Sequence, residues 1–112
     1  MINTLDSSEF YMIWIDIRRE YFTPMEEANK LYVNSIFKLV VSNKMAVGIR
    51  IDNESSFLKI FGYWDGLKSL PLWYANNNGI SNFHDFASFG GWVQPSIKSY
   101  RVLNEYTELI CF

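Results

Sequence analysis

The sequence predicts an α/β fold with a parallel sheet, in a single domain over residues 1–112. Apolar segments typical of buried strands alternate along the chain with segments of helical periodicity, and this order favours parallel strands. The chain of 112 residues has room for one domain, and 49% of its residues are hydrophobic, which supplies a core. An open sheet and a piece of a barrel both fit this pattern.

The first half of the chain predicts a strand, a helix and a second strand. Residues 11–17, YMIWIDI, are rich in β-branched and aromatic side chains and indicate a buried strand. Thr23 is a suitable N-cap for the following helix, with Glu26 completing a capping box. This helix is expected to end near Asn43, and residues 45–51, MAVGIRI, indicate the second strand. The predicted buried face of the helix consists of Met25, Ala28, Tyr32, Ile36, Leu39 and Val40.

The second half predicts a short helix and two further strands. Asn53 is a suitable cap for a helix over 54–61, which Gly62 is expected to end. Strands are predicted at 70–75 and 96–103. The segment after the last strand is amphipathic and fits no single type of element.

Charge and hydrophobicity bound the partners that the chain is expected to have. The formal net charge is −2 and no cluster of basic residues is present, so a nucleic-acid partner is not expected. No stretch reaches the length of about 18 consecutive apolar residues that a membrane-spanning helix requires, so no membrane partner is expected. Residues 1–10 contain no lysine or arginine, and no signal peptide is recognisable in the chain as written.

The single histidine, His84, and the single cysteine, Cys111, limit the chemistry. One cysteine does not form an intrachain disulfide, and one histidine does not make an ordinary zinc site. Neither a metal nor another cofactor is therefore expected. His84 beside Asp85 is a candidate general base. The simpler alternative is a histidine that packs within an aromatic segment.

Charged residues at the ends of the first two predicted strands are the main candidates for a site. Asp16, Arg18 and Glu20 alternate along one strand and should share a face, so the two carboxylates are candidates for an acid and base pair. The alternative is that Arg18 and Glu20 lie beyond the strand end in solvent. Arg50 and Asp52 repeat the pattern on the second strand, which predicts an ion-pair cluster at the strand ends.

Aromatic side chains provide a second candidate site, a sugar-binding groove, because their faces stack on the apolar faces of sugars. The alternative for at least half of them is packing in the core. The candidates for this groove are Tyr63, Trp64, Trp73, Tyr74, Trp92 and Tyr100.

Several segments form a combination that is more specific than any single motif. They are PLWYA at 71–75, an aromatic segment ending in FGGW at 89–92, and an Ile-Lys-x-Tyr pattern at 97–100. Together with IWIDI at 13–17, they resemble glycoside hydrolase family 25, the muramidase-type lysozymes. The resemblance covers residues 11–100 and is greatest with the branch found in nematodes and amoeboid protists.

This resemblance implies a fold and a setting. The family folds as a (β/α) barrel of about 200–250 residues, so the chain resembles the C-terminal half of a TIM-like barrel, with about four parallel strands. A half barrel leaves an open sheet edge and an uncovered apolar face, so it is expected to pair with a second copy or another partner, to rearrange, or to be marginally stable. The family acts on the glycan of bacterial cell walls, which implies a secreted protein or one in a lysosome or digestive vacuole.

One position departs from the family in a way that bears on catalysis. The family strand has Asp-x-Glu, and its glutamate is the expected proton donor. Here Asp16 matches the aspartate, and Arg18 stands at the glutamate position. A guanidinium does not give up its proton in proteins, so it does not replace a carboxylic acid. Glu20 is displaced along the strand by about 6–7 Å, which is too far for a substitute.

The resemblance therefore predicts a catalytically impaired lysozyme-like protein that retains glycan or protein binding in innate antibacterial defence. Asp16 is the remaining half of the catalytic pair, and the sequence leaves open whether the chain is an enzyme. One alternative is an active lysozyme that hydrolyses the β-1,4 bond after N-acetylmuramic acid. Another is a partial, non-functional gene product. The residues predicted to contact the sugar are Trp73, Tyr74, Trp92 and Tyr100.

Overall fold

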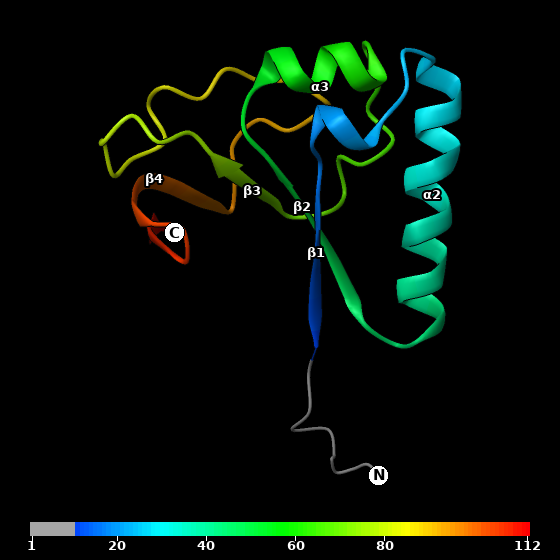
Figure 1. The fold of residues 1–112 in the computed structure, drawn as a ribbon, viewed down its shortest axis with the longest axis horizontal. Coiled ribbons are helices and arrows are strands. Elements are labelled where there is room, and N and C mark those ends of the chain that lie inside the picture. Colours follow the sequence, from blue (N-terminus) through cyan, green and yellow to red (C-terminus); the bar gives the residue numbers. More distant parts are fainter. Residues whose placement is uncertain (1–10) are drawn as a thin grey trace, which may run out of the picture.

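The computed structural model describes residues 11–112, which form one five-stranded sheet with helices (Figure 1). The strands are β1 (Met12–Asp16), β2 (Ala46–Ile51), β3 (Leu72–Ala75), β4 (Ile97–Asn104) and β5 (Thr107–Cys111). They follow this order across the sheet, with β1 to β4 parallel and β5 antiparallel to β4. The predicted α/β class with four parallel strands is confirmed, and strand boundaries differ from the prediction by one or two residues.

The helices pack against one face of the sheet. They are the α-helices α2 (Glu26–Ser42) and α3 (Glu54–Phe61), whereas the 3-10 turn η1 (Arg19–Tyr21) follows β1 and contacts α3. Alternate strand residues, including Ile15, Ile49 and Leu72, join the helices in one buried apolar cluster. The opposite sheet face carries the other alternate residues, among them Asp16 and Arg50.

The start of α2 differs from the prediction. The helix begins at Glu26 with Met25 as its N-cap, so Thr23 is not the N-cap. The reason is the buried side chain of Asn29, which accepts a hydrogen bond from the Thr23 N–H at 2.9 Å and donates one to the Ile60 carbonyl at 2.8 Å. Asn29 therefore ties the segment before α2 to the end of α3, and this tie holds Thr23 outside the helix.

The buried face of α2 also differs from the prediction. Val40 and Ile36 of the predicted face do pack in or against the core, and Val33, which was not predicted, is also buried. Met25, Tyr32 and Leu39 of the predicted face, however, are 68%, 51% and 64% exposed. The helix has two neighbouring apolar stripes, and the contacts with the sheet and α3 bury the stripe that contains Val33. The other stripe lies on the surface of this chain.

The short helix α3 has the predicted boundaries and cap. Asn53 Oδ1 accepts a hydrogen bond from the Ser56 N–H at 2.9 Å, and Gly62 follows the last residue with a φ of 68°. A positive φ of this kind suits glycine, which explains why the helix stops there. The capped helix fixes the position of Ser56, which lines the pocket described below.

The hairpin of β4 and β5 brings the last part of the chain back across the sheet. The Asn104 side chain accepts a hydrogen bond from the Tyr106 N–H at 2.8 Å in the turn, and the strand register shifts at two points. Such irregularities bend and twist a hairpin. As a result, Glu108 of β5 contacts Arg50 of β2, although β3 and β4 lie between the two strands in the sheet order. The sequence did not predict β5.

Candidate functional site

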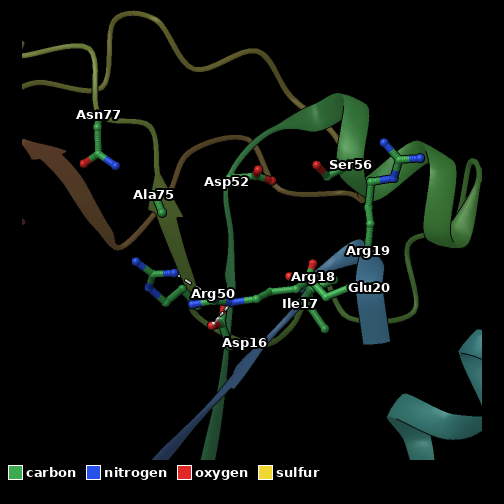
Figure 2. A pocket seen from close by; sticks show the side chains of 10 residues that line it. All are labelled: Asp16, Ile17, Arg18, Arg19, Glu20, Arg50, Asp52, Ser56, Ala75 and Asn77. Carbon is green, nitrogen blue, oxygen red and sulfur yellow. Dashed lines mark hydrogen bonds and ion pairs between the residues drawn. The ribbon is translucent and has the colours of Figure 1, made fainter. Parts of the chain in front are cut away.

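A pocket of about 350 Å³ opens at the carboxyl ends of β1, β2 and β3 (Figure 2). In parallel sheets with covering helices, ligands bind at this edge. Both acidic and basic side chains line the pocket, so it offers hydrogen-bond donors and acceptors together. The lining residues are Asp16, Ile17, Arg18, Arg19, Glu20, Arg50, Asp52, Ser56, Ala75 and Asn77.

Asp16 lies at the centre of an ion-pair cluster in this pocket. Arg18 Nε donates to one carboxylate oxygen at 2.8 Å, and Arg50 Nη1 donates to the other at 3.3 Å. Arg50 Nη2 also donates to both carboxylate oxygens of Glu108, at 2.8 and 3.0 Å. We call Asp16, Arg18, Arg50 and Glu108 the arginine cluster. The predicted cluster is present, but within residues 11–112 Asp52 forms no ion pair and Glu108 joins instead.

Arg18 and Glu20 lie beyond the end of β1, which stops at Asp16. The chain turns at Arg19, where η1 begins, and the side chains of Arg18 and Glu20 are both exposed. The prediction that Asp16, Arg18 and Glu20 share one strand face is therefore wrong. The alternative, in which the last two lie in solvent beyond the strand, is confirmed.

Asp16 raises the pKa of the Arg18 guanidinium, first through its hydrogen bond and then through its charge. Arg18 is therefore positively charged around neutral pH and does not supply a proton. Both carboxylate oxygens of Asp16 accept hydrogen bonds from arginines. The arrangement suits the binding of polar groups through hydrogen bonds better than it suits proton transfer.

Trp73 lies beside the arginine cluster on the same sheet face. The Arg50 guanidinium carbon is 5.1 Å from the centre of the Trp73 ring, and Trp14 meets this ring edge-on with centroids 5.5 Å apart. Trp73 Nε1 donates to Ser99 Oγ at 2.7 Å. A guanidinium over an indole face is an attractive contact. The chain's own Arg50 thus occupies a ring face on which a sugar was predicted to stack.

The other predicted sugar contacts lie elsewhere. Tyr74 and Trp92 are only 6% and 5% exposed, and the Trp92 ring packs edge-on against Phe57 in the core. Burial leaves neither ring a free face, so the structure contradicts their role in stacking on a sugar. Tyr100 is half-buried on β4 and does not line the pocket at Asp16. Of these four residues, the structure brings Trp73 alone into contact with the arginine cluster.

A second cluster of charged and polar groups surrounds the amino group of Lys98 on β4. The Lys98 side chain is 0% exposed. Its Nζ donates at 2.7 Å to the carboxylate of Asp85. The remaining oxygens around Nζ are Asn78 Oδ1 at 3.0 Å and the carbonyls of Ile80 and Asn82, each at 2.9 Å. We call this arrangement the lysine cage. It fixes the loop after β3, in which Asn77 lines the pocket.

The contacts of the lysine cage are incompatible with His84 as a base held by Asp85. The Asp85 carboxylate accepts hydrogen bonds from Lys98 and Asn76, whereas His84 is exposed and has no side-chain hydrogen bond within the described residues. The hypothesis of a His84 base held by Asp85 is therefore wrong. Partial burial acts to raise the pKa of Asp85, but the hydrogen bonds from Lys98 and Asn76 lower it below its ordinary value.

The sequence analysis missed Glu108 and the role of Lys98. Turn-forming Asn104, followed by the alternating segment at 107–111, is the signal that predicts a hairpin and hence a returning strand. A lysine between the apolar Ile97 and the buried Ser99 is a weaker signal for a buried cation. Partners of Lys98 lie up to 20 residues away, and the strand pattern does not identify them.

Two further properties concern only the part of the chain that the structure describes. Residues 11–112 contain no group of three or more histidine, cysteine, aspartate or glutamate residues placed to hold a metal ion. No helix in this range is both long and apolar enough to cross a membrane.

The parallel strands, their covering helices and the charged pocket at the carboxyl ends define part of a glycosidase-type (β/α) barrel. A family model described as "Lysozyme-like protein 1" matches residues 1–100. This chain therefore belongs to the lysozyme-like family of glycoside hydrolase family 25 type. The resemblance inferred from the PLWYA and FGGW segments is confirmed.

The chain is similar to curated lysozyme and lysozyme-like proteins of Dictyostelium discoideum and Caenorhabditis elegans. "Probable GH family 25 lysozyme 5" of Dictyostelium discoideum is 39% identical over 94 residues, which cover 79% of this chain and 42% of the relative. "Probable GH family 25 lysozyme 4" of the same organism is 34% identical, covering 85% of this chain and 44% of the relative. "Lysozyme-like protein 5" of Caenorhabditis elegans is 28% identical, with 79% and 41% covered.

The chain thus spans less than half the length of each of these relatives. No solved structure matches it significantly.

Proposed function

We propose that this chain is a lysozyme-like protein that binds bacterial cell-wall glycan without cleaving it. The observation that carries the proposal is the arginine cluster. Asp16 is held between Arg18 and Arg50, and Arg18 stands where the family resemblance places the proton donor. Glycosidic cleavage requires a carboxyl group that protonates the leaving oxygen, and a guanidinium does not perform this step.

The pocket supports binding because its side chains pair with sugar hydroxyl and amide groups. Asp16, Glu20 and Asp52 offer acceptors, and Arg18 and Arg19 offer donors. The Trp73 ring adds little stacking while Arg50 covers it. Hydrogen bonds that compete with water give modest affinity, so we expect dissociation constants in the millimolar range.

The proposed setting follows from the family. The relatives carry the name lysozyme, and peptidoglycan is therefore the proposed ligand. We place the protein outside the cell or in a digestive vacuole, where it meets bacterial walls in antibacterial defence. A second form of this proposal is that the protein acts by binding another protein through its scaffold and not through the pocket.

Two measurements test the proposal with one set of variants. Wall clearing is followed by turbidity of Gram-positive cell walls, and binding is followed by sedimentation with purified peptidoglycan. We expect no clearing by the natural sequence and saturable binding that is weakened by Asp16→Asn. Clearing by the natural protein removes the non-catalytic assignment, and absence of saturable binding at millimolar sugar removes the glycan ligand.

A second candidate, an active lysozyme, rests on one observation. Glu20 and Asp52 line the same pocket as Asp16, so three carboxyl groups face one space. If the protein clears cell walls, Glu20→Gln and Asp52→Asn identify the acid. If the natural protein does not clear cell walls, Arg18→Glu tests whether the proton donor is what is missing. Recovered clearing by this variant means that the remaining site is intact.

A further inference from the structure

We propose that a second glycan-binding site, a cleft, lies at the other end of α3 from the pocket at Asp16. The choice of ligand rests on the proposed function, but the cleft shares no residue with that pocket. Ser56 in the first turn of α3 lines the pocket, whereas the cleft begins at Tyr63, just after the helix ends. The cleft has a volume of about 460 Å³. Its lining residues are Tyr63, Trp64, Asp65, Gly90 and Gly91.

The two glycines of the FGGW segment bring the walls of the cleft together. One wall is the loop between α3 and β3, and the other is the glycine turn before β4, so neither edge strand of the sheet contributes to it. Gly90 and Gly91 have φ angles of 60° and 86°, which suit glycine. A Cβ atom added at Gly91 would lie 2.7 Å from Lys68 Cβ and 3.0 Å from Asp65 Cβ, which is too close for carbon atoms. The turn therefore reaches the loop because position 91 lacks a side chain.

Tyr63 and Trp64 give the cleft one free ring and one fixed ring. Tyr63 is 97% exposed, so its ring has a face on which a ligand can stack. Trp64 is held by Phe61, with ring centroids 5.3 Å apart, and by Lys30, whose Nζ lies 5.7 Å from the ring centre. Within residues 11–112, the indole N–H of Trp64 has no acceptor, which leaves a donor for an oxygen of the ligand.

The charges beside the cleft favour a neutral sugar over an ionic ligand. The Asp65 carboxylate pairs with Lys68 Nζ at 3.3 Å, and both side chains are exposed. Such a pair is weak, so a ligand replaces it at low cost. The pair offers an acceptor and a donor without net charge, which suits hydroxyl groups because they both donate and accept. A β-linked N-acetylglucosamine unit combines such groups with a flat apolar face that fits the Tyr63 ring.

An NMR titration with the tetramer of N-acetylglucosamine tests the cleft and the pocket together. The indole N–H resonances report on each, since Trp64 lines the cleft and Trp73 contacts the arginine cluster. Trp64→Phe assigns the first resonance, because it keeps an aromatic ring and removes the N–H. We expect the Trp64 resonance to shift and saturate at millimolar sugar, both in the natural chain and in Asp16→Asn.

Tyr63→Ala should weaken the binding seen at Trp64 by at least about fivefold, because it removes the stacking face. Tyr106→Ala is the matched control, since Tyr106 is 89% exposed in the turn between β4 and β5 and lines neither site. We expect no change for this control. Both side chains are exposed, so both variants should keep the fold, and the dispersion of the same spectra verifies this.

A Trp64 resonance that does not move with millimolar sugar overturns the second site. A shift of this resonance that Asp16→Asn abolishes also overturns it, because the effect then originates at the pocket. So does a shift that Tyr63→Ala leaves unchanged. If Trp64 shifts while Trp73 stays fixed, the cleft is supported and the pocket of the proposed function is not.

Discussion

The lysine cage and the arginine cluster place charge in the same sheet in opposite ways. Lys98 is 0% exposed and has four oxygen partners, one of them the carboxylate of Asp85. In the arginine cluster, the side chains are between 21% and 51% exposed. A buried charge without partners is strongly unfavourable, whereas a partly exposed ion pair contributes about 0–1 kcal/mol.

The buried lysine cage thus belongs to the scaffold of the fold, whereas the partly exposed arginine cluster belongs to the candidate site. The cage holds the loop after β3 in place, so we expect stability to depend on it. The cluster lies at the pocket mouth, where water replaces lost partners at low cost. We therefore expect an exchange between carboxylate and guanidinium at position 18 to leave the fold intact. Variants should therefore lose most stability at Lys98 and least at Arg18.

Replacing the buried cation should have the largest effect. Lys98→Met removes the charge and keeps the length of the side chain, and it leaves Asp85 without its cation. We expect a loss of about 3–5 kcal/mol in unfolding free energy, measured by urea titration. Lys59→Met, at an exposed position of α3, is the control and should change stability by less than about 0.5 kcal/mol. Equal losses for the two variants would show that the buried cation stabilises the fold no more than an exposed lysine does.

Acid should weaken the lysine cage through Asp85. The pKa of Asp85 is below its ordinary value of 3.8. Its contribution is therefore fully present above that value, and it is lost as the pH falls through the lower pKa of the folded state. Asp85→Asn should cost about 1–3 kcal/mol at neutral pH. The difference between the two proteins should shrink at pH 3, as measured by unfolding at several pH values; a constant difference contradicts this.

Removing the central arginine of the cluster should have an intermediate effect. Arg50→Ala loses its ion pairs with Asp16 and Glu108 and its contact with the Trp73 ring. We expect a loss of about 1–2 kcal/mol in unfolding free energy. The uncovered Trp73 face should also strengthen binding of chitin oligosaccharides, followed by tryptophan fluorescence. Arg50→Lys keeps the charge without the planar guanidinium, so its stability should lie between those of the natural protein and Arg50→Ala. If Arg50→Ala loses as much stability as Lys98→Met, the arginine cluster is as important for the fold as the lysine cage.

The smallest effect is expected at the pocket mouth. Arg18→Ala removes a side chain that is 51% exposed and, among residues 11–112, pairs with Asp16 alone. The expected change in unfolding free energy is less than about 1 kcal/mol. The same urea titration measures it, with Lys68→Ala as the control, because Lys68 forms a similarly exposed pair with Asp65. A loss above about 2 kcal/mol places Arg18 in the scaffold instead of the site.

The local sequence predicted the elements well because their signals are local. The Asn53 cap and the Gly62 stop of α3 act within a few residues, and both are present. The family segments gave the order of the parallel strands. The N-terminus of α2 was mispredicted because Asn29 bonds to Ile60, which is 31 positions away in the chain. The Thr23 capping signal was locally reasonable, and a distant contact overrode it.

The candidate site was predicted only in part, because some of its contacts also join residues far apart in the sequence. Asp16, Arg18 and Arg50 stand at strand ends, and parallel pairing brings such ends together. Glu108 depends on the bend of the last hairpin, which alternation alone does not specify. Tyr74 and Trp92 illustrate the ambiguity of aromatic residues, since ring type is the same for a core position and for a sugar platform. Burial separates the two roles.

The position of Glu108 has a consequence for the order of assembly. Arg50 contacts partners 34 and 58 positions away in the chain. Contacts of such separation form after the closure entropy of the intervening chain has been overcome by other interactions. We therefore expect the helices and the first strands to form before the pocket acquires its final charge distribution. We also expect the contact between Arg50 and Glu108 at the pocket mouth to open more readily than the buried core, and hydrogen exchange measures this difference.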